Sequence, residues 1–310
     1  MSDMETQRLA CDASGVRTAA DILCKGGLVA FPTETVYGLG ADARNGKAVA
    51  RIYAAKGRPA FNPLIVHVCS LAAARRYGVF DADMMRLADQ FWPGPLSLVV
   101  PLAADHGLSP LVTAGLDTVA LRVPEHPLAQ TLLTEFDGPV AAPSANPSGQ
   151  ISPTKADHVI AGLAGRINAV IDGGACRVGL ESTIVSGAPP ALLRPGGVAQ
   201  EDIEALTGPL ARAGTGITAP GQLNSHYAPR AALRLHARSA HSGELLLGFG
   251  SVSGDLNLSP TGDLIEAAAN LFGHLHMLDA QDRPIAVARI PDTGLGRAIN
   301  DRLERAAAPR

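Results

Sequence analysis

A lysine and an arginine two positions apart are the first residues in this sequence that could do chemistry. Lys56 and Arg58 stand in Lys56-Gly57-Arg58-Pro59, where a helical pattern stops and the backbone turns. The chain has only four lysines, so arginine is its usual cation and a lysine is informative. Arginine offers a planar fork for two phosphate oxygens, and lysine offers a compact mobile charge. The pair indicates a phosphate-binding turn, with a dipole-compensating role for Lys56 at the helix end as the alternative.

Two polar loops offer further groups that an anionic ligand could contact. Pro32-Thr33-Glu34-Thr35 follows an apolar run, at a strand end where α/β proteins commonly bind ligands. Pro143-Ser144-Ala145-Asn146-Pro147-Ser148-Gly149 offers hydroxyls, an amide and backbone N–H groups in a compact turn. Ser152-Pro153 is typical of a helix N-cap followed by proline, a position that also favours anions. The second loop indicates a phosphate site, with an ordinary Asn/Pro turn as the alternative.

The distribution of charge also favours an anionic ligand, although the chain as a whole is acidic. Its formal net charge of −3 excludes a protein held to nucleic acid by overall attraction, and 4% aromatic residues argue against base-stacking surfaces. Residues 43–80 and 205–243 nevertheless contain no Asp or Glu, while both stretches hold arginines. We expect local positive potential there, unless these residues form ordinary solvated helix faces.

Composition and spacing exclude several other kinds of site. The four cysteines form no Cys-x-x-Cys pair, so neither a zinc ribbon nor a disulfide framework is expected. Gly38-Leu39-Gly40-Ala41-Asp42-Ala43 resembles a dinucleotide fingerprint, but it lies beyond the strand and lacks the later acidic residue. With no apolar signal core and no membrane-spanning run, a cytoplasmic protein without a membrane partner is expected.

Apolar periodicity predicts the elements that must position these groups. The expected strands and helices are short and interspersed, and they do not alternate regularly. Strands are expected at 27–31, 64–68, 96–100, 118–123, 169–171, 182–185 and 191–194, and helices at 14–25, 45–56, 83–91, 127–136, 153–163 and 200–206. This order favours an α/β fold with a mixed sheet over a regular doubly wound one.

The chain is further predicted to divide into two domains. Residues 207–230 are rich in Gly and Pro and lack periodicity, which indicates a linker. Beyond it, strands are expected at 244–249 and 285–290 and helices at 263–278 and 297–306, enough for a small α/β domain. The expected division is 1–206 for the main domain, 207–230 for the linker and 231–310 for the C-terminal domain.

Taken together, these segments resemble the YrdC-like family, and the whole chain is similar to the two-domain form of that family. The motifs are Phe31-Pro32-Thr33-Glu34-Thr35-Val36-Tyr37-Gly38-Leu39, Lys56-Gly57-Arg58-Pro59 with Asn62-Pro63-Leu64, Ala142-Pro143-Ser144-Ala145-Asn146, Glu181-Ser182-Thr183-Ile184-Val185, Leu193-Arg194-Pro195-Gly196, and Pro220-Gly221 followed by His226-Tyr227-Ala228-Pro229. The resemblance implies a YrdC-like twisted mixed sheet around a concave cavity at 1–206. It also implies a linker that forms a lid over the site, and a small Rossmann-like α/β domain at 231–310.

Members of this family make L-threonylcarbamoyladenylate from L-threonine, bicarbonate or CO2, and ATP, with release of pyrophosphate. This synthesis is the first step of threonylcarbamoyl-adenosine (t6A) modification of tRNA. The resemblance therefore implies a nucleotidyltransferase that uses Mg2+ with ATP, without dedicated protein ligands for the metal. It also implies a product that passes to the tRNA threonylcarbamoyl-transfer machinery, and weak RNA binding is a further expectation.

The resemblance assigns roles to individual residues. The Lys56-x-Arg58 and Ser144-x-Asn146 pairs are expected to be the functional signature around the nucleotide phosphates and Mg2+. The expected threonine pocket consists of Thr35, His67, Arg122, Ala142 and Ser182, with Arg122 gripping the carboxylate. The expected ATP side consists of Arg58, Asn62, Thr118, Ser144, Ser152, Arg194, His226 and Tyr227. Glu34 is a candidate proton acceptor, but the sequence establishes no general base.

Three other readings of the sequence stay open at this point. One is a related carbamoyl-adenylate-forming protein of hydrogenase maturation, which the lack of Cys-x-x-Cys pairs disfavours. Another is an RNA-binding module, which the net charge and low aromatic content disfavour. The third is a paralogue that has kept the fold and lost the activity, against which the intact Lys56, Arg58, Ser144 and Asn146 argue.

Overall fold

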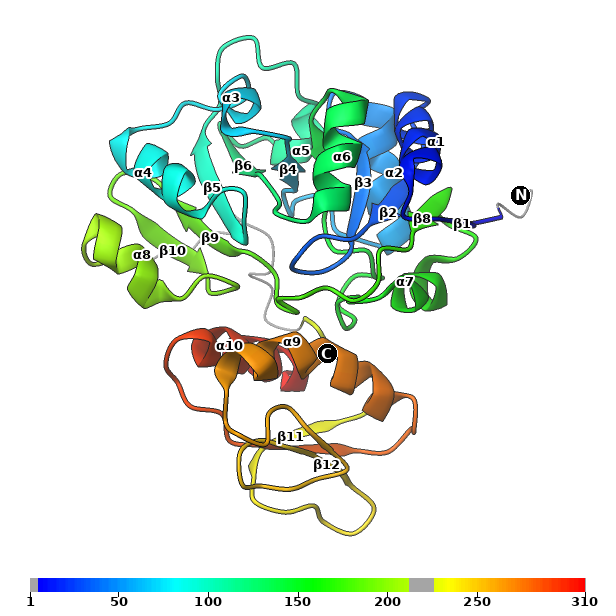
Figure 1. The fold of residues 1–310 in the computed structure, drawn as a ribbon, viewed down its shortest axis with the longest axis vertical. Helices are drawn as coiled ribbons and strands as arrows, with labels where there is room; N and C mark the ends of the chain where they lie inside the picture. The colour runs from blue at the N-terminus through cyan, green and yellow to red at the C-terminus, as the bar shows by residue number, and fades with distance from the viewer. Residues whose placement is uncertain (1–4, 212–225, 310) are drawn as a thin grey trace.

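The computed structural model describes residues 5–211 and 226–309, and these residues form two sheets, each with helices packed on it (Figure 1). A ten-stranded sheet occupies the N-terminal part of the chain and a four-stranded sheet the C-terminal part. Residues 212–225 of the expected linker lie outside the described residues. The predicted α/β fold, with a mixed sheet and a second, smaller domain, is confirmed.

The large sheet is mixed, which explains the irregular order of strands and helices in the sequence. Four neighbouring pairs run parallel and five run antiparallel. In spatial order its strands are β1 (Gln7–Leu9), β8 (Ala169–Ile171), β2 (Val29–Phe31), β3 (Gly38–Asp42), β7 (Val140–Ala141), β4 (Ile65–His67), β6 (Thr118–Arg122), β5 (Leu96–Pro101), β9 (Thr183–Ser186) and β10 (Ala191–Arg194). The middle strands are buried on both faces, so they form continuous apolar runs.

Helices cover the large sheet and bury their apolar faces against it. They are α1 (Ala13–Cys24), α2 (Gly46–Lys56), α3 (Leu71–Ala74), α4 (Ala82–Phe91), α5 (Pro110–Thr113), α6 (Pro127–Phe136), α7 (Ala156–Leu163) and α8 (Gln200–Thr207). Helix α2 begins where the Asn45 side chain accepts the Lys47 and Ala48 N–H groups. It ends at Gly57, whose φ of 60° is the left-handed conformation that glycine adopts without strain. This end fixes where Lys56 and Arg58 leave the helix.

Two predicted helix starts were wrong. The helix expected at 14–25 begins one position earlier, at Ala13, where the Asp12 side chain caps it by accepting the Gly15 N–H at 2.8 Å. Helix α7 begins at Ala156 after Lys155, three residues later than Ser152-Pro153 predicts. Ser152 is therefore no N-cap, and its hydroxyl donates to Glu181 instead.

The C-terminal part is a parallel sheet whose helices α9 and α10 face the large sheet (Figure 1). Its strands, in spatial order, are β11 (Leu233–Ala237), β14 (Ile285–Ala288), β12 (Leu245–Gly248) and β13 (Leu256–Asn257), and its helices are α9 (Leu264–Asp279) and α10 (Leu295–Ala307). One apolar cluster joins the inner faces of both helices to Val36, Ile151, Leu180 and Tyr227. The two parts of the molecule thus share a core.

No helix in residues 5–211 or 226–309 combines the length and the apolar character that are needed to cross a bilayer.

Candidate active site

A cavity of about 550 Å³, counting its open mouth, brings together side chains from both halves of the large sheet and from the end of the linker. All five residues of the predicted threonine pocket line it, namely Thr35, His67, Arg122, Ala142 and Ser182. Five residues of the predicted ATP side line it too, namely Arg58, Ser144, Arg194, His226 and Tyr227. Residues far apart in sequence therefore meet in one space, as the motifs predict.

Strand register places two of these side chains next to each other. Strands β4 and β6 run parallel, and His67 is the register partner of Arg122. Both residues end short apolar runs, so both side chains emerge at the same end of the two strands. Ala142 follows β7 on the other side of β4, where its N–H donates to the Ile65 carbonyl at 2.9 Å. Three adjacent strands thus supply one wall of the cavity.

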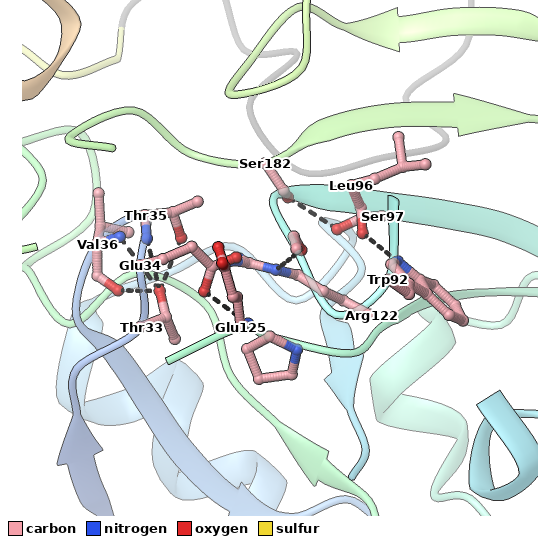
Figure 2. Close-up of polar contacts among 12 residues, drawn as sticks. Thr33, Glu34, Thr35, Val36, Trp92, Leu96, Ser97, Arg122, Glu125 and Ser182 are labelled. Carbon is pink, nitrogen blue, oxygen red and sulfur yellow. Dashed lines mark hydrogen bonds and ion pairs between the residues drawn. The ribbon is translucent and has the colours of Figure 1, made fainter. Parts of the chain in front are cut away.

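Arg122 is held by a buried carboxylate from the loop after β2. Its Nη2 donates to Glu34 Oε1 at 2.5 Å and its Nε donates to the Gly94 carbonyl at 3.2 Å, as Figure 2 shows for the ion pair. The second Glu34 oxygen accepts the Glu125 N–H at 3.1 Å. Both side chains of the pair are almost fully buried. Glu34 therefore fixes the plane of the guanidinium and is fully engaged in doing so.

Hydroxyl groups continue the polar wall on both sides of this ion pair. The Thr33 and Thr35 hydroxyls lie 2.7 Å apart, and Thr33 Oγ1 also donates to the Val36 carbonyl. On the other side, the Ser97 and Ser182 hydroxyls lie 2.7 Å apart (Figure 2). The orientation of Thr35 is therefore set by Thr33 of the same motif, and that of Ser182 by Ser97, which no motif includes.

His67 is neutral and lacks a partner at one ring nitrogen. Burial, reinforced by the nearby Arg122 cation, lowers the pKa of His67 to about 3. Its Nδ1 is buried and has no hydrogen-bond partner among the described residues. His67 therefore offers a neutral ring nitrogen to a ligand, not a positive charge.

Arg58 and Lys56 leave helix α2 in different directions. Arg58 lines the cavity, and its guanidinium donates to the Asn62 and Pro63 carbonyls of its own turn at 3.4 and 3.0 Å. Lys56 does not line the cavity, because its ammonium donates to the carbonyls of Ser144 and Asn146. Burial lowers the pKa of Arg58 to about 10, and burial together with Arg58 lowers the pKa of Lys56 well below its usual value.

Unmatched buried polar atoms concentrate around this cavity. Asn62 Nδ2 and Oδ1, His67 Nδ1, Asn146 Oδ1 and His226 Nδ1 are buried without a hydrogen-bond partner among the described residues, and His274 Nδ1 is one more such atom outside the predicted set. The Asn146 amide is oriented by its Nδ2, which donates to the Pro147 and Gln150 carbonyls, so its free oxygen is a true acceptor. Buried polar groups normally have partners, so this concentration is typical of a ligand site.

Five predicted residues do not line the cavity. Asn146 belongs to the Ser144 loop, and Lys56 contacts that loop through its carbonyl groups. Asn62 is fully buried in the Arg58 turn, and Ser152 donates to Glu181. Thr118 begins β6, at the opposite end of the strand from Arg122. Its role in binding ATP stays a prediction.

A second group of polar side chains forms the wall of the cavity opposite β4, β6 and β7. Only some of these residues belong to the site that the sequence predicts. Glu181 lines the cavity, accepts the Ser152 hydroxyl, and accepts Arg302 Nε at 2.8 Å. Arg194 donates through Nη2 to the Ser182 carbonyl at 2.8 Å and to its hydroxyl at 3.2 Å. Burial would raise the pKa of Glu181, but Arg302 and Arg194 offset it, so this pKa lies below its usual value.

Arg302, on α10, is the contributor that sequence reasoning missed. The signal was an arginine among the residues Ala298, Ile299, Leu303 and Ala306 on the buried face of α10. A cation on the apolar face of an amphipathic helix indicates a buried partner.

The buried charges of the described residues are predominantly positive. They are five cations, Lys56, Arg58, Arg122, Arg194 and Arg302, and two carboxylates, Glu34 and Glu181. Each of them lines the cavity or contacts a residue that does. The interior of a chain whose net charge is −3 therefore carries a local excess of positive charge.

The stretches without acidic residues contribute less to this excess than the sequence predicts. From 43–80 only Lys56 and Arg58 reach the region of the cavity, and Arg44 forms an ion pair with Asp42. From 205–243, Arg230 and Arg234 form ion pairs with Asp279 and Glu244, away from the cavity lining. Arg212 lies outside the described residues. Three arginines of these stretches, Arg44, Arg230 and Arg234, thus form ion pairs outside the cavity.

Two family models divide nearly the whole chain between them. A model described as telomere recombination, which bears the names Sua5, yciO and yrdC, matches residues 21–196. A model described as the C-terminal domain of threonylcarbamoyl-AMP synthase matches residues 198–308.

Individual proteins match over the same length. The threonylcarbamoyl-AMP synthase of Bacillus subtilis (strain 168) is 41% identical over 335 residues, which cover 98% of this chain and 96% of that protein. The synthase of Pyrococcus abyssi (strain GE5 / Orsay) is 41% identical over 326 residues, which cover 95% of this chain and 94% of that protein. A crystal structure of P. abyssi Sua5 complexed with L-threonine superposes with a TM-score of 0.89 at 37% identity, over 97% of both chains.

Proposed function

This chain belongs to the family of two-domain threonylcarbamoyl-AMP synthases, and on that premise we propose that its cavity holds threonine and ATP side by side for adenylation. The protein is a nucleotidyltransferase that forms L-threonylcarbamoyladenylate from L-threonine, bicarbonate or CO2, and ATP, with release of pyrophosphate. This product serves t6A modification of tRNA.

The excess of buried cations around the cavity carries the proposal. Among the residues that the structure describes, five buried cations and two buried carboxylates lie in this region. Uncompensated buried charge costs several kcal/mol unless a partner of opposite sign arrives. Threonine carbamate and ATP together bring two carboxylate groups and a triphosphate, which supply that negative charge. A neutral substrate would bring no negative charge to this positively charged region.

The threonine side of the site is proposed to be Arg122, His67 and Thr35, with Ala142 and Ser182 completing the pocket. Arg122 uses Nε and one Nη2 hydrogen toward Gly94 and Glu34, so its fork keeps N–H donors for a carboxylate. His67, its register partner, accepts from or donates to the amine end as a neutral ring. Shape around Ala142 then limits the side chain that fits.

The ATP side is proposed to be Arg58, Arg194, Ser144, His226 and Tyr227. Arg58 keeps its positive charge at neutral pH, since its pKa of about 10 lies well above 7. Lys56 is proposed to act indirectly. Its ammonium donates to the carbonyls of Ser144 and Asn146 and so holds the loop that binds the phosphates. Binding of ATP by Asn62, Thr118 and Ser152 is proposed from the family resemblance alone.

Magnesium is proposed to enter with ATP. No cluster of three or more His, Cys, Asp or Glu side chains that could hold a metal occurs within residues 5–211 and 226–309. The oxygens that fit Mg2+ are the unpartnered Asn146 Oδ1 and the Ser144 hydroxyl, since this ion prefers oxygen ligands and keeps several waters. Bound there, it would neutralise charge on the phosphates. Ser144 and Asn146 would orient that end of the nucleotide.

The reaction itself is a displacement at phosphorus between two anions. The threonine amine is first carboxylated, and a carbamate oxygen then forms a bond to the α-phosphorus while the bond to pyrophosphate breaks. Arg122 holds the nucleophile through the threonine carboxylate, and Arg58 and Arg194 bind the charge that develops on the phosphates. Holding both reactants in one enclosed space supplies proximity and orientation. The chain needs no covalent nucleophile for this chemistry.

Pyrophosphate release with and without L-threonine in bicarbonate buffer tests the proposed function. We expect release to require threonine, and Arg58→Ala to abolish it while the circular dichroism spectrum and thermal midpoint stay near those of the unmodified chain. Equal release with serine, or with no amino acid, would overturn the assignment of substrate. Near-normal turnover by Arg58→Ala would overturn the role of Arg58.

We also propose a role for each part of the chain and a destination for the product. We assign catalysis to residues 1–206, a lid to 207–230 and a supporting domain to 231–310. The strands of the two sheets, which fall on either side of 207–230, support this division. The product is proposed to pass to the tRNA threonylcarbamoyl-transfer machinery.

The burial of the cavity arginines disfavours the alternative of an RNA-binding module. Arg58, Arg122 and Arg194 are at most 8% exposed, so they suit a small enclosed ligand better than the surface of duplex RNA.

A further inference from the structure

Arg302 crosses from the C-terminal domain to the wall of the cavity. It lies on α10 and is 1% exposed. Its Nε donates to Glu181 at 2.8 Å, and its Nη2 donates to the Pro195 carbonyl at 2.9 Å. Its Nη1 donates to Asp301 at 2.6 Å, which keeps the guanidinium oriented along its own helix. One buried side chain thus joins two segments of the catalytic domain.

The same guanidinium supports the end of the linker. Its central carbon lies 5.0 Å from the centre of the Tyr227 ring, a cation–π contact. Tyr227 packs against Phe272 of α9 on another side, and the His226 N–H donates to the Arg305 carbonyl at 3.2 Å. His226 and Tyr227 both line the cavity. Their position therefore depends on α9 and α10.

Glu181 connects Arg302 to the cavity, because it pairs with Arg302 and itself lines the cavity. One Glu181 oxygen pairs with Arg302 and the other accepts the Ser152 hydroxyl. Glu181 also precedes Ser182, whose carbonyl binds Arg194. Without Arg302, a buried carboxylate would face the bound phosphates without its partner, and like charges in a buried site repel strongly.

We propose that Arg302 is a positioning residue for ATP, which neutralises Glu181 and holds Tyr227 so that the nucleotide side of the cavity forms only when α10 is docked. This inference rests on the proposed function, because it names what the C-terminal domain does for that site. Threonine binding should depend on Arg302 much less, since Arg122, Glu34 and His67 all belong to the catalytic domain.

The test is steady-state pyrophosphate release by the full chain, with KM measured separately for ATP and for threonine. We expect Arg302→Met to raise KM for ATP at least tenfold and KM for threonine less than threefold. Arg302→Met combined with Glu181→Gln should recover at least part of that loss, because glutamine removes the unpaired charge. A merely structural role for Arg302 would give no such rescue.

The matched control is Arg297→Met on the same helix. Arg297 also reaches the catalytic domain, through Glu201 at 3.2 Å, but it lies at the surface and away from the cavity lining. Both KM values should stay within twofold in this variant. The unmodified chain is assayed first, so absence of threonine-dependent release there would overturn the proposed function before any variant is compared.

Several results would overturn the role of Arg302. These are an unchanged KM for ATP in Arg302→Met, an equal rise of both KM values, and a double variant no better than Arg302→Met alone. If Arg302→Met does not fold, Arg302→Gln takes its place, because glutamine can keep a hydrogen bond to Glu181 but removes the positive charge. An unchanged KM for ATP in a folded Arg302→Gln protein would then overturn the proposal.

Discussion

The buried cations around the cavity differ in the partners that hold them. Arg122 pairs with a carboxylate, Glu34, whereas the contacts of Arg58 and Lys56 are with backbone carbonyls. A carbonyl orients a cation without cancelling its charge. Arg58, which lines the cavity, should therefore attract phosphate mainly through its charge, and Arg122 should contribute mainly through its geometry.

Replacing Arg122 by lysine should weaken threonine binding and spare ATP. Lysine keeps the charge beside Glu34 but lacks the planar fork for a carboxylate. A charge-assisted hydrogen bond contributes about 1.5–3 kcal/mol, so KM for threonine should rise about 10- to 150-fold. The measurement is KM for each substrate in the pyrophosphate assay. Arg177→Lys, at an exposed ion pair with Glu125, is the control and should change neither value. An equal rise in both KM values for Arg122→Lys would contradict the assignment.

Some site residues could be predicted from the sequence and others could not. Lys56 and Arg58 are close in sequence and stand out in a chain with few lysines, so spacing alone indicates them. Arg302 binds Glu181 across 121 positions. Its place on the apolar face of α10 indicates a buried partner, but no local pattern identifies that partner as Glu181. Glu34 was considered as a proton acceptor, but its two oxygens already bind Arg122 and Glu125, which makes it a support for Arg122.

At the scale of elements, apolar runs predicted the strands that are rich in Val, Ile and Leu but missed those that tertiary packing creates. Strand β3 contains Gly38 and Gly40 and was not predicted. A Cβ on Gly40 would come within 2.9 Å of the Phe31 and Val140 side chains, so the neighbouring strands leave room only for glycine. This packing also explains the misleading dinucleotide-like spacing of these glycines. β7 is two residues long, too short for any periodicity to indicate it.

The buried histidines of β4 and the linker should make the fold sensitive to acid. The pKa values of His67 and His226 fall to about 3, chiefly through burial, against about 6.5 in the unfolded chain. Below pH 6.5 the unfolded state therefore binds more protons, and the free energy of unfolding falls as pH decreases toward 3. Each of these histidines contributes a slope of up to about 1.4 kcal/mol per pH unit, and stability should level off above pH 6.5.

Denaturant unfolding at pH 7, 6 and 5 checks this expectation, with a variant at a third histidine. His158 stacks on His276 at 3.8 Å between ring centres, and burial lowers the pKa of His158 to about 4. His158→Gln should reduce the dependence on pH, while His241→Gln, at an exposed position, should leave it unchanged. Equal stability of the unmodified chain at pH 7 and pH 5 would contradict the prediction.

At the scale of the whole molecule, the loop before β9 lies so close to helix α9 that no side chain fits at Gly179. Gly179 has a φ of +73°, and a Cβ there would lie 2.4 Å from the Ala268 carbonyl oxygen. The two parts of the chain also share an apolar cluster. We therefore expect them to unfold together in one transition, although the chain is long enough for two independent domains.

Gly179→Ala should loosen this contact, and Gly174→Ala is its matched control. Gly174 has a φ of +80° and nothing within 4 Å of an added Cβ, so both variants share the backbone strain and only one adds a clash. Overpacking costs about 1–3 kcal/mol, so Gly179→Ala should lose that much more unfolding free energy than Gly174→Ala in urea. The same loss in both variants would show that the close approach contributes nothing.

The ion pair between Glu181 and Arg302 also has a consequence for folding of the chain during its synthesis on the ribosome. The ribosome makes Glu181 121 positions before it makes Arg302. At about 5–20 residues per second, about 6–24 seconds pass between the synthesis of Glu181 and the synthesis of its partner Arg302. During that interval the nascent chain holds an acidic group that it cannot yet bury with a partner. Competence to bind ATP should therefore appear late in synthesis, only after the final helix has emerged.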